Sequence, residues 1–410
     1  MYKHTEEAWL TWSEINQIQN RRRLVFFGRG EWLEKSLPYL GSPAAYVVDN
    51  NRYEQGEIEH GLEIHSPEVL NSVNPHTVFI IITTTSFPDV DRQLRSYGFE
   101  PGIDFCVSPS LKNFQVTSRV HGHNQTIHFT CSDQPDRGGG FYSFDLASLK
   151  KTQLIKGHCH GIFQSDDDIA LVDDLVGVRI LNSDLETIRI IDMPSKSRPH
   201  GISICSKRRK LFVNFSGQDS IGIFDIDTGK FDGKIQVSDK FHKTGVAQHH
   251  INDCTVYGDY LYVSMFSASG NWKIGMYDGV IMQYDIDSRQ CLGVVASDLW
   301  MPHTPIVING VLHYCDSMRG IVSDTTWRSM TQFTGFIRGI TYDGVFYYVG
   351  QSAHRYIDRR SQTSNNISLD TGIFLVDAVN KVTKFFSIPD LTDINSVIYL
   401  SSGFKHEVQL

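Results

Sequence analysis

Histidine recurs at the openings of hydrophobic runs in the second part of this 410-residue chain. The triplet His-Gly-Ile begins at His160 and again at His200, and His250 and His303 stand at the openings of later runs. Neutral imidazole is a ligand for Zn, Fe, Mn, Ni and Cu, whereas several protonated imidazoles in one place would repel one another. Four histidines brought to one point would therefore hold a divalent transition metal.

A repeated pattern of strands and tight turns surrounds these histidines. Short runs rich in Val, Ile, Phe and Tyr alternate with polar turns, as expected for β-hairpins. Further openings at Arg338 and Asn395 follow the four histidines, and successive openings are 35 to 57 residues apart. Such intervals are typical of four-stranded propeller blades with variable loops. We therefore expect an all-β six-bladed β-propeller over residues 118–402, in which the C-terminal strand completes the first blade.

The first strand of each propeller blade lines the central axis, so the openings of these strands converge at one end. The predicted metal ligands are accordingly His160, His200, His250 and His303. A bound divalent ion, with zinc, iron and manganese as candidates, would be held by the neutral rings. The alternative is that each histidine is structural and only hydrogen-bonds the backbone of the neighbouring blade.

Charged side chains near the same openings are candidates for binding substrate and moving protons. His354 and Arg355 lie in the longest loop, and four further residues lie just beyond second strands: Asp173, Asp174, Asp316 and Arg319. Arg338 takes the place of histidine in its own blade, where an unpaired cation would favour an anionic ligand. Together these residues could bind a carboxylate or phosphate and supply a general base. The alternative for each is a solvated loop residue or a salt-bridge partner.

The first part of the chain has a different pattern, in which strands alternate with helices. Residues 24–28, 44–49 and 77–83 are predicted strands, and residues 31–40 and 89–98 are predicted helices. This alternation predicts a small α/β domain with a parallel sheet over residues 21–107. The change of pattern places the linker at residues 106–120.

The turn after the first strand has features of a nucleotide site. Gly28 and Gly30 form a G-x-G turn, which lets backbone N–H groups approach a phosphate. Asp49 closes the second strand, where a ribose-binding carboxylate would lie. Leu33 replaces the third glycine of the dinucleotide motif, so a Rossmann-like turn with a purely structural role stays open.

Two regions resemble known families. The small Rossmann-like domain of bacterial sugar acetyltransferases and nucleotide-sugar proteins is similar to the segments VFFGRG, VVDNNRYEQG, GLEIHSPEVL and VFIIITTTSFPDVDRQLRSYGFEPGIDF. This resemblance implies a nucleotide or nucleotide-sugar near Gly28, Gly30 and Asp49. A family of uncharacterised bacterial six-bladed propeller proteins resembles LWMPHTPIVINGVLHYCDSMRGIV and FIRGITYDGVFYYVGQSAHR, and implies no established activity.

Composition limits the partners and the compartment. The formal net charge of -8 and the pI near 6.1 argue against binding to nucleic acid or to an anionic membrane surface. The sequence has no signal-peptide pattern and no apolar stretch long enough for a membrane helix, so we expect a cytoplasmic protein. Seven scattered cysteines favour neither a disulfide framework nor a paired-cysteine zinc site.

These observations together predict two domains and favour one function. The leading hypothesis is a metal-dependent propeller enzyme, of lyase or hydrolase type, that acts on a small anionic and sugar-derived substrate in a glycan or secondary-metabolite pathway. Its rival is a non-catalytic protein that senses a nucleotide-sugar and binds a partner or glycan, with structural histidines. A third interpretation, NAD chemistry in the front domain, is disfavoured by the absent third glycine. The protein could form a homo-oligomer.

Overall fold

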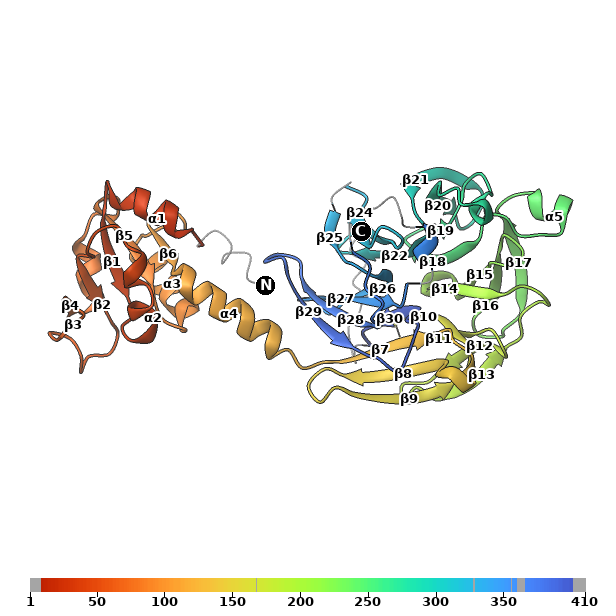
Figure 1. Cartoon of the computed structure of the whole chain (residues 1–410), viewed down its shortest axis with the longest axis horizontal. Helices are drawn as coiled ribbons and strands as arrows, with labels where there is room; N and C mark the ends of the chain where they lie inside the picture. The colour runs from red at the N-terminus through yellow and green to blue at the C-terminus, as the bar shows by residue number, and fades with distance from the viewer. Residues whose placement is uncertain (1–8, 167, 327–328, 355, 360–365, 401–410) are drawn as a thin grey trace. The chain divides into compact units, whose positions relative to one another are not determined.

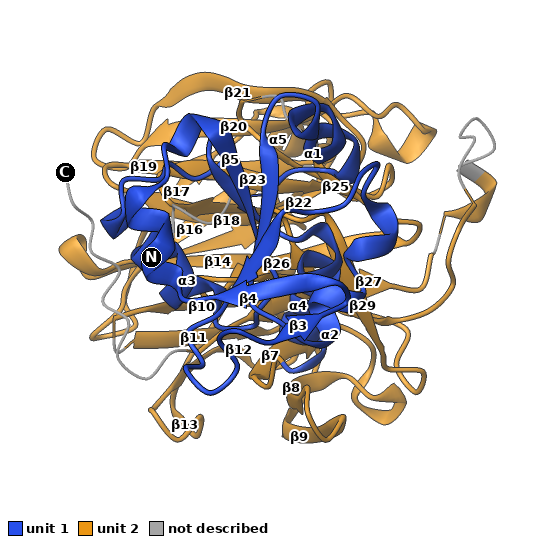
Figure 2. Ribbon diagram, turned by 90° about the vertical axis from the view of Figure 1, so that its left-hand side faces the viewer, with its two compact units in different colours: residues 1–122 blue, residues 123–410 orange. Residues whose placement is uncertain are grey.

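The computed structural model divides the chain into two compact units, residues 1–122 and residues 123–410 (Figure 2). The structure describes residues 9–166, 168–326, 329–354, 356–359 and 366–400. Each unit is built around hydrophobic cores of its own.

A six-stranded sheet forms the centre of the first unit (Figure 1). Its strands are β1 (Arg23–Phe27), β2 (Tyr46–Val48), β3 (Ile58–Glu59), β4 (Leu62–His65), β5 (Val78–Ile82) and β6 (Phe105–Val107), in the order β3-β4-β2-β1-β5-β6. Neighbouring strands pair in parallel from β4 through β2, β1 and β5 to β6. Strand β3 pairs antiparallel with β4. The predicted parallel pairing is present, and the short β3–β4 hairpin makes the sheet mixed.

Both faces of this sheet are buried, which explains why its central strands are continuous apolar runs. Val25 and Phe27 pack into one core, and Leu24 and Phe26 pack into the other. Successive side chains of a strand point to opposite faces, so each core receives every second residue.

Helices precede and connect these strands within the described residues. They are α1 (Trp12–Gln19), α2 (Glu31–Glu34), α3 (Phe87–Ser96) and α4 (Pro109–His121). Gly98, which has a φ of 87°, follows α3 as the sequence predicts. The sequence pattern did not predict α1, and the predicted linker at 106–120 is instead the end of β6 followed by α4. Pro109 lies in the first turn of α4, a position that proline fits.

Six four-stranded antiparallel sheets make up the described part of the second unit. They are β10–β13, β14–β17, β18–β21, β22–β25, β26–β29 and the sheet β30-β7-β8-β9. The innermost strands β10, β14, β18, β22, β26 and β30 each contact the innermost strand of the next sheet, and β30 contacts β10. This ring confirms the predicted six-bladed β-propeller (Figure 1).

The strands of the propeller are short and regular. The first three blades that follow β9 contain β10 (Cys159–Ser165), β11 (Asp168–Asp173), β12 (Gly177–Leu181), β13 (Thr187–Ile191), β14 (Pro199–Cys205), β15 (Lys210–Phe215), β16 (Ser220–Asp225), β17 (Phe231–Gln236), β18 (Ile251–Tyr257), β19 (Tyr260–Met265), β20 (Gly279–Asp285) and β21 (Cys291–Leu299). The remaining blades contain β22 (Pro302–Ile308), β23 (Val311–Asp316), β24 (Ile321–Asp324), β25 (Ser329–Gln332), β26 (Phe336–Tyr342), β27 (Tyr347–Ser352), β28 (Gly372–Asp377), β29 (Val382–Ser387), β30 (Ser396–Ile398), β7 (Thr126–Cys131), β8 (Gly140–Asp145) and β9 (Lys150–Lys156). A short helix, α5 (Lys240–Thr244), lies between β17 and β18.

The C-terminal strand closes the ring as the sequence predicts. Strand β30 pairs antiparallel with β7, so that Ser396 lies opposite Thr130 and Val397 lies opposite Phe129. Closure of this kind joins the two ends of the propeller and covers the edge of β7 that would otherwise be unpaired.

The cysteines and the helix lengths can be compared with the composition in the described residues. All seven cysteines are free, and all except Cys291 are buried. None of the described helices is both long enough and apolar enough to cross a membrane.

Candidate metal centre

The innermost strands from β10 to β26 each carry a β-bulge near their opening. In β10 the bulge contains His160 and Gly161, and in β14 it contains His200 and Gly201. The strand registers assign equivalent positions to His160, His200, Asn252, Thr304 and Arg338. Bulges redirect side chains and often lie next to functional sites.

This register corrects the sequence alignment of the openings. Asn252 and Thr304 occupy the position that the sequence pattern assigned to His250 and His303. His250 lies two residues before that position, and His303 lies one residue before it. The sequence alignment missed the offset because a bulge inserts a residue without any mark in the composition.

The glycine of the His-Gly-Ile triplet allows adjacent innermost strands to approach. A Cβ atom on Gly161 would lie 2.7 Å from the carbonyl oxygen of His200. A Cβ atom on Gly201 would lie 2.4 Å from Cα of Asp253. Both distances are shorter than van der Waals contact, so only glycine fits without a shift of the backbone. The triplet therefore brings neighbouring strands, and the histidines on them, close together.

At the strand openings, aromatic rings from successive blades contact one another. The ring centroids of His160 and His200 are 4.2 Å apart, and those of His200 and His250 are 5.5 Å apart. Phe266 lies between His250 and His303, at centroid distances of 4.3 and 5.1 Å. The structure thus brings three predicted ligands into consecutive contact, whereas a phenylalanine separates the fourth from them.

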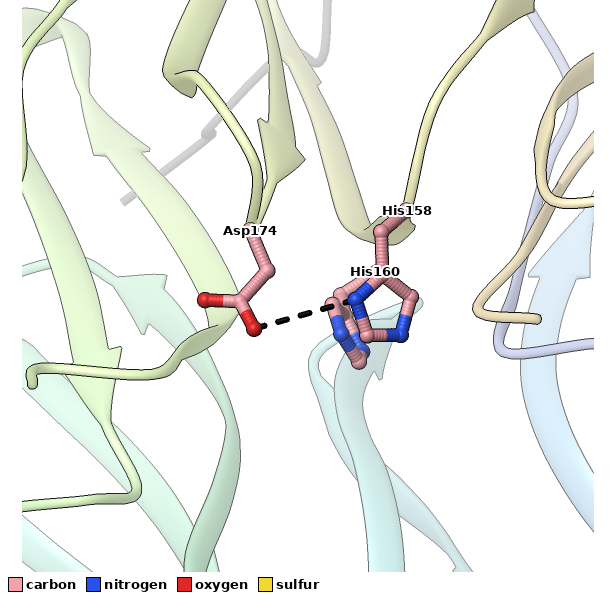
Figure 3. Close-up of side chains that lie close together, drawn as sticks. All are labelled: His158, His160 and Asp174. Atoms are coloured by element: carbon pink, nitrogen blue, oxygen red, sulfur yellow. Dashed lines mark ion pairs between the residues drawn. The ribbon is translucent and has the colours of Figure 1, made fainter. Parts of the chain in front are cut away.

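Among the described residues, one group of three side chains could share a metal ion: His158, His160 and Asp174. Their ligand atoms all lie within 4.8 Å of one another, and Nδ1 of His158 lies 3.7 Å from Oδ2 of Asp174. Figure 3 shows the Asp174 carboxylate turned toward the two imidazoles. Two imidazoles and one carboxylate suit Zn or Fe and leave coordination positions open. Of the predicted ligand set, only His160 belongs to this group.

Strands β10 and β11 position the three side chains. His158 directly precedes β10, His160 lies on it, and Asp174 directly follows β11. Cys159 pairs with Asp173, so the opening of one strand meets the end of the other. Residues two apart on a strand point to the same side, which lets both histidines face the carboxylate.

Asp173 holds the backbone of this group in place. Its Oδ1 atom accepts hydrogen bonds from the backbone N–H groups of His158 at 3.1 Å and Leu175 at 3.2 Å. Its Oδ2 atom accepts two from the Arg179 guanidinium, at 2.9 and 3.0 Å. A Cβ atom on Gly157 would lie 2.5 Å from this carboxylate, so glycine makes room for it. The predicted catalytic Asp173 is therefore engaged in structural contacts.

Burial controls the charge of the surrounding groups. Burial raises the pKa of Asp174, whereas the nearby His158 and Arg198 lower it. Burial and then the adjacent imidazoles lower the pKa of His200 well below its usual value, and burial and Arg198 lower the pKa of His250 to about 3. Both rings are uncharged at neutral pH, which is the form that binds metal or accepts a proton. Nδ1 of His200 is buried and has no hydrogen-bond partner in the described part of the chain.

Hydrogen bonds fix two other predicted ligands. The side-chain amide of Asn395 donates to Nδ1 of His160 at 3.1 Å. Nδ1 of His303 lies 2.9 Å from the carbonyl oxygen of Met301 and 2.7 Å from the hydroxyl of Ser317. Burial lowers the pKa of His303 well below its usual value. Met301 lies two residues before His303 in the same segment, so this contact is local and is not the contact with a neighbouring blade that the structural alternative predicts.

Two predicted catalytic residues are occupied by ion pairs. Arg338 pairs with Asp393, and both side chains are buried, so the expectation of an unpaired cation is wrong. Asp316 bonds Arg319 at 3.0 Å and accepts the backbone N–H of Trp300 at 2.8 Å. Burial raises the pKa of Asp316 to about 6.

The remaining loop candidates are His354 and Arg355. His354 is 5% exposed, and its Nδ1 atom accepts the backbone N–H of Tyr356 at 3.1 Å. Its ring centroid lies 5.7 Å from that of Phe336, which continues the row of rings from His303. Arg355 lies outside the described residues.

The predicted nucleotide residues of the first unit form a tight turn. Gly28 and Gly30 have φ angles of 102° and 93°, which glycine adopts readily. The Asp49 carboxylate accepts the backbone N–H groups of Arg29 at 3.1 Å and Asn51 at 2.8 Å. The carboxylate predicted to meet a ribose thus already stabilises its own turn.

Sequence reasoning missed two residues of the propeller site, His158 and Arg198. His158 could have been found from the sequence Gly157-His158-Cys159-His160-Gly161, in which two histidines share one side of a strand opening. The strand registers also show that His158, Arg198 and His250 occupy equivalent positions.

The fold and the site together define a six-bladed β-propeller with a histidine-rich opening. No protein-family model and no curated protein sequence matches the chain. Similar solved structures include a nidogen/laminin complex, with 13% identity over 67% of this chain and 97% of the matched chain and a TM-score of 0.47. They also include a protein of unknown function from Bacteroides caccae, with 12% identity over 67% of this chain and 98% of the matched chain and a TM-score of 0.48.

Proposed function

We propose that the chain is a metal-dependent enzyme, of lyase or hydrolase type, whose divalent ion is held by His158, His160 and Asp174. The convergence of three ligand atoms within 4.8 Å carries this proposal. This centre replaces the predicted set of four histidines, because only His160 belongs to the close group. Zinc or iron fits a site of two imidazoles and one carboxylate.

A bound ion would polarise a carbonyl or phosphoryl oxygen or activate a water molecule. The residues of the chain have supporting roles. Asp173 fixes the His158 backbone. His200 offers an uncharged imidazole 4.2 Å, centroid to centroid, from His160, where it can contact the substrate. The substrate in this proposal is small, anionic and sugar-derived.

Metal analysis of untagged protein tests the proposal. We expect about one equivalent of Zn²⁺ or Fe²⁺ per chain, and loss of that metal in H158A, H160A and D174A. The control H242A alters an exposed histidine on α5 and should keep its metal. H200A and H303A distinguish the two ligand sets, because both should keep the metal if the three-residue group binds it. Metal loss in H303A, or equal metal content in H160A and wild type, would overturn the proposal.

Catalysis needs a separate assay. Metal-loaded wild type and H160A would be incubated with uronic acids and sugar phosphates, and products followed by mass spectrometry. Turnover by wild type and its loss in H160A would support an enzyme. Binding without turnover, unchanged in H160A, would favour the second candidate.

The second candidate is a non-catalytic propeller that binds a glycan or protein partner. Its support is that Asp173, Asp316 and Arg338 are engaged in structural contacts. The predicted nucleotide or nucleotide-sugar near Gly28, Gly30 and Asp49 would then act as a signal. Thermal-shift assays with UDP-sugars and NAD test that site. A shift that D49A abolishes would support it, and no shift with any of them would contradict it.

A further inference from the structure

Arg198 is an exposed cation beside the candidate metal centre. It directly precedes β14, the innermost strand that lies between β10 and β18 in the ring. Its position is equivalent to those of His158 on one side and His250 on the other. Arg198 forms no ion pair with any residue that the structure describes, whereas Arg208 and Arg209 of the same blade pair with aspartates.

The backbone holds Arg198 in a restrained conformation. Its φ is 47°, and the equivalent His250 has a φ of 50°. Side-chain-bearing residues rarely adopt this left-handed region, and such outliers cluster at functional sites. The carbonyl oxygen of Arg198 accepts hydrogen bonds from the backbone N–H of Ser216 at 3.2 Å and from its hydroxyl at 2.9 Å. A Cβ atom on Gly217 would lie 3.2 Å from Cγ of Arg198, so the aliphatic stem packs over this glycine.

The charge of Arg198 reaches several groups of the site. It lowers the pKa values of Asp174, His200 and His250. His250 also contacts the Trp272 ring, at a centroid distance of 4.9 Å, which adds an aromatic surface on the same side.

We propose that Arg198 binds the oxyanion of the substrate, a carboxylate or a phosphate, next to the metal centre. This inference rests on the proposed function and assigns to Arg198 the anion-binding role that was predicted for Arg338. A guanidinium presents a planar fork of N–H donors that matches both oxyanions. The uncharged part of the substrate then lies toward the rings of His250 and Trp272.

Calorimetric titration of the metal-free protein with inorganic phosphate, and separately with acetate, tests the inference. We expect R198A to weaken binding of the preferred anion at least tenfold. R198K keeps the charge and loses the fork, so we expect a smaller loss. The control K207A removes an exposed cation of the same blade and should bind like wild type. Whichever anion binds more tightly identifies the oxyanion of the substrate.

A parallel titration with Zn²⁺ separates the two proposals. R198A should bind Zn²⁺ within about threefold of wild type, because Arg198 is not a ligand. Equal anion affinity in R198A and wild type, or no anion binding by wild type, would overturn the role of Arg198. Loss of anion binding in R198A from a protein that binds no Zn²⁺ would overturn the metal centre and leave the oxyanion site supported.

Discussion

His158 and His160 owe their shared orientation to the single residue between them. On an extended strand, residues two apart point to the same side. Cys159 points the other way and is buried in the blade. Asp174 then approaches both rings from the end of β11. All three ligands therefore come from one blade, so their proximity depends first on the local pairing of β10 with β11.

The hydrogen bond from His158 to Asp173 predicts a positioning role for this aspartate. D173N should weaken Zn²⁺ binding by about tenfold. Metal sites lose affinity of this order when a hydrogen-bond partner that supports a metal ligand is removed. The control D225N alters an aspartate that accepts from Thr228 in a distant turn, and it should leave Zn²⁺ affinity unchanged. Competition titrations against a chelating dye measure both variants. Equal Zn²⁺ affinity in D173N and wild type would contradict the role.

Asp316 predicts a dependence of stability on pH. Burial raises the folded-state pKa of Asp316 from 3.8 to about 6, so the folded protein binds this proton more tightly than the unfolded chain does. The contribution of this group to stability therefore falls as pH rises from about 4 to about 6. In D316N that loss is absent, so its unfolding free energy relative to wild type should rise by about 2 kcal/mol between pH 4.5 and pH 7.5. Urea unfolding at pH 4.5 and 7.5 measures the difference, and an identical difference at both values would contradict it.

The sequence identified only part of the site. His160 was predictable because its triplet recurs at His200, whereas His158 has no equivalent histidine in the next blade. An anionic ligand was predicted for Arg338 because its actual partner, Asp393, could not be recognised from the sequence. Asp393 lies far along the chain, in the segment before β30. Such pairings depend on ring closure, and no local pattern records them.

The close approach of neighbouring innermost strands explains why a glycine follows His160 and His200. G161A should destabilise the propeller by about 2–3 kcal/mol, because the added methyl group would overlap the His200 carbonyl and force the strands apart. The control G41A adds a methyl group whose nearest neighbour is 3.7 Å away, and it should change stability little. Urea unfolding measures both. Equal stability of G161A and wild type would show that the strands can separate without cost.

Most secondary structure was predictable, and the exceptions have physical causes. Alternating apolar residues and polar turns predicted the propeller hairpins. Residues 106–120 were predicted as a linker because their helical pattern is weak, with only Leu111 and Val120 buried in α4. The offset of His250 and His303 was hidden because a bulge changes strand register without changing composition.

The propeller as a whole depends on the short pairing of β30 with β7. Val397 is 3% exposed, and Cβ atoms on Gly339 and Gly350 would each lie 2.9 Å from its side chain. V397D should destabilise the protein by several kcal/mol, about 3 or more, because it buries an unpaired charge where the ring closes. The control V379D changes a valine that is 62% exposed. Thermal unfolding compares them, and equal melting temperatures would contradict the importance of closure.

The number of blades and their closure were predictable because six openings appeared while the first blade lacked an inner strand. The chemistry was less predictable, because a sequence repeat specifies equivalent positions and a metal site needs particular distances. His160 and His200 are equivalent, yet the ligand group joins His160 to His158 and Asp174 of its own blade.

Anomalous diffraction at the zinc absorption edge, from crystals of the untagged protein grown with Zn²⁺, tests the metal centre most directly. We expect one strong peak at about 2.0–2.2 Å from a nitrogen of His158, a nitrogen of His160 and an oxygen of Asp174. A map without a peak at these three residues, or with its only strong peak between His200 and His250, would contradict the proposed centre.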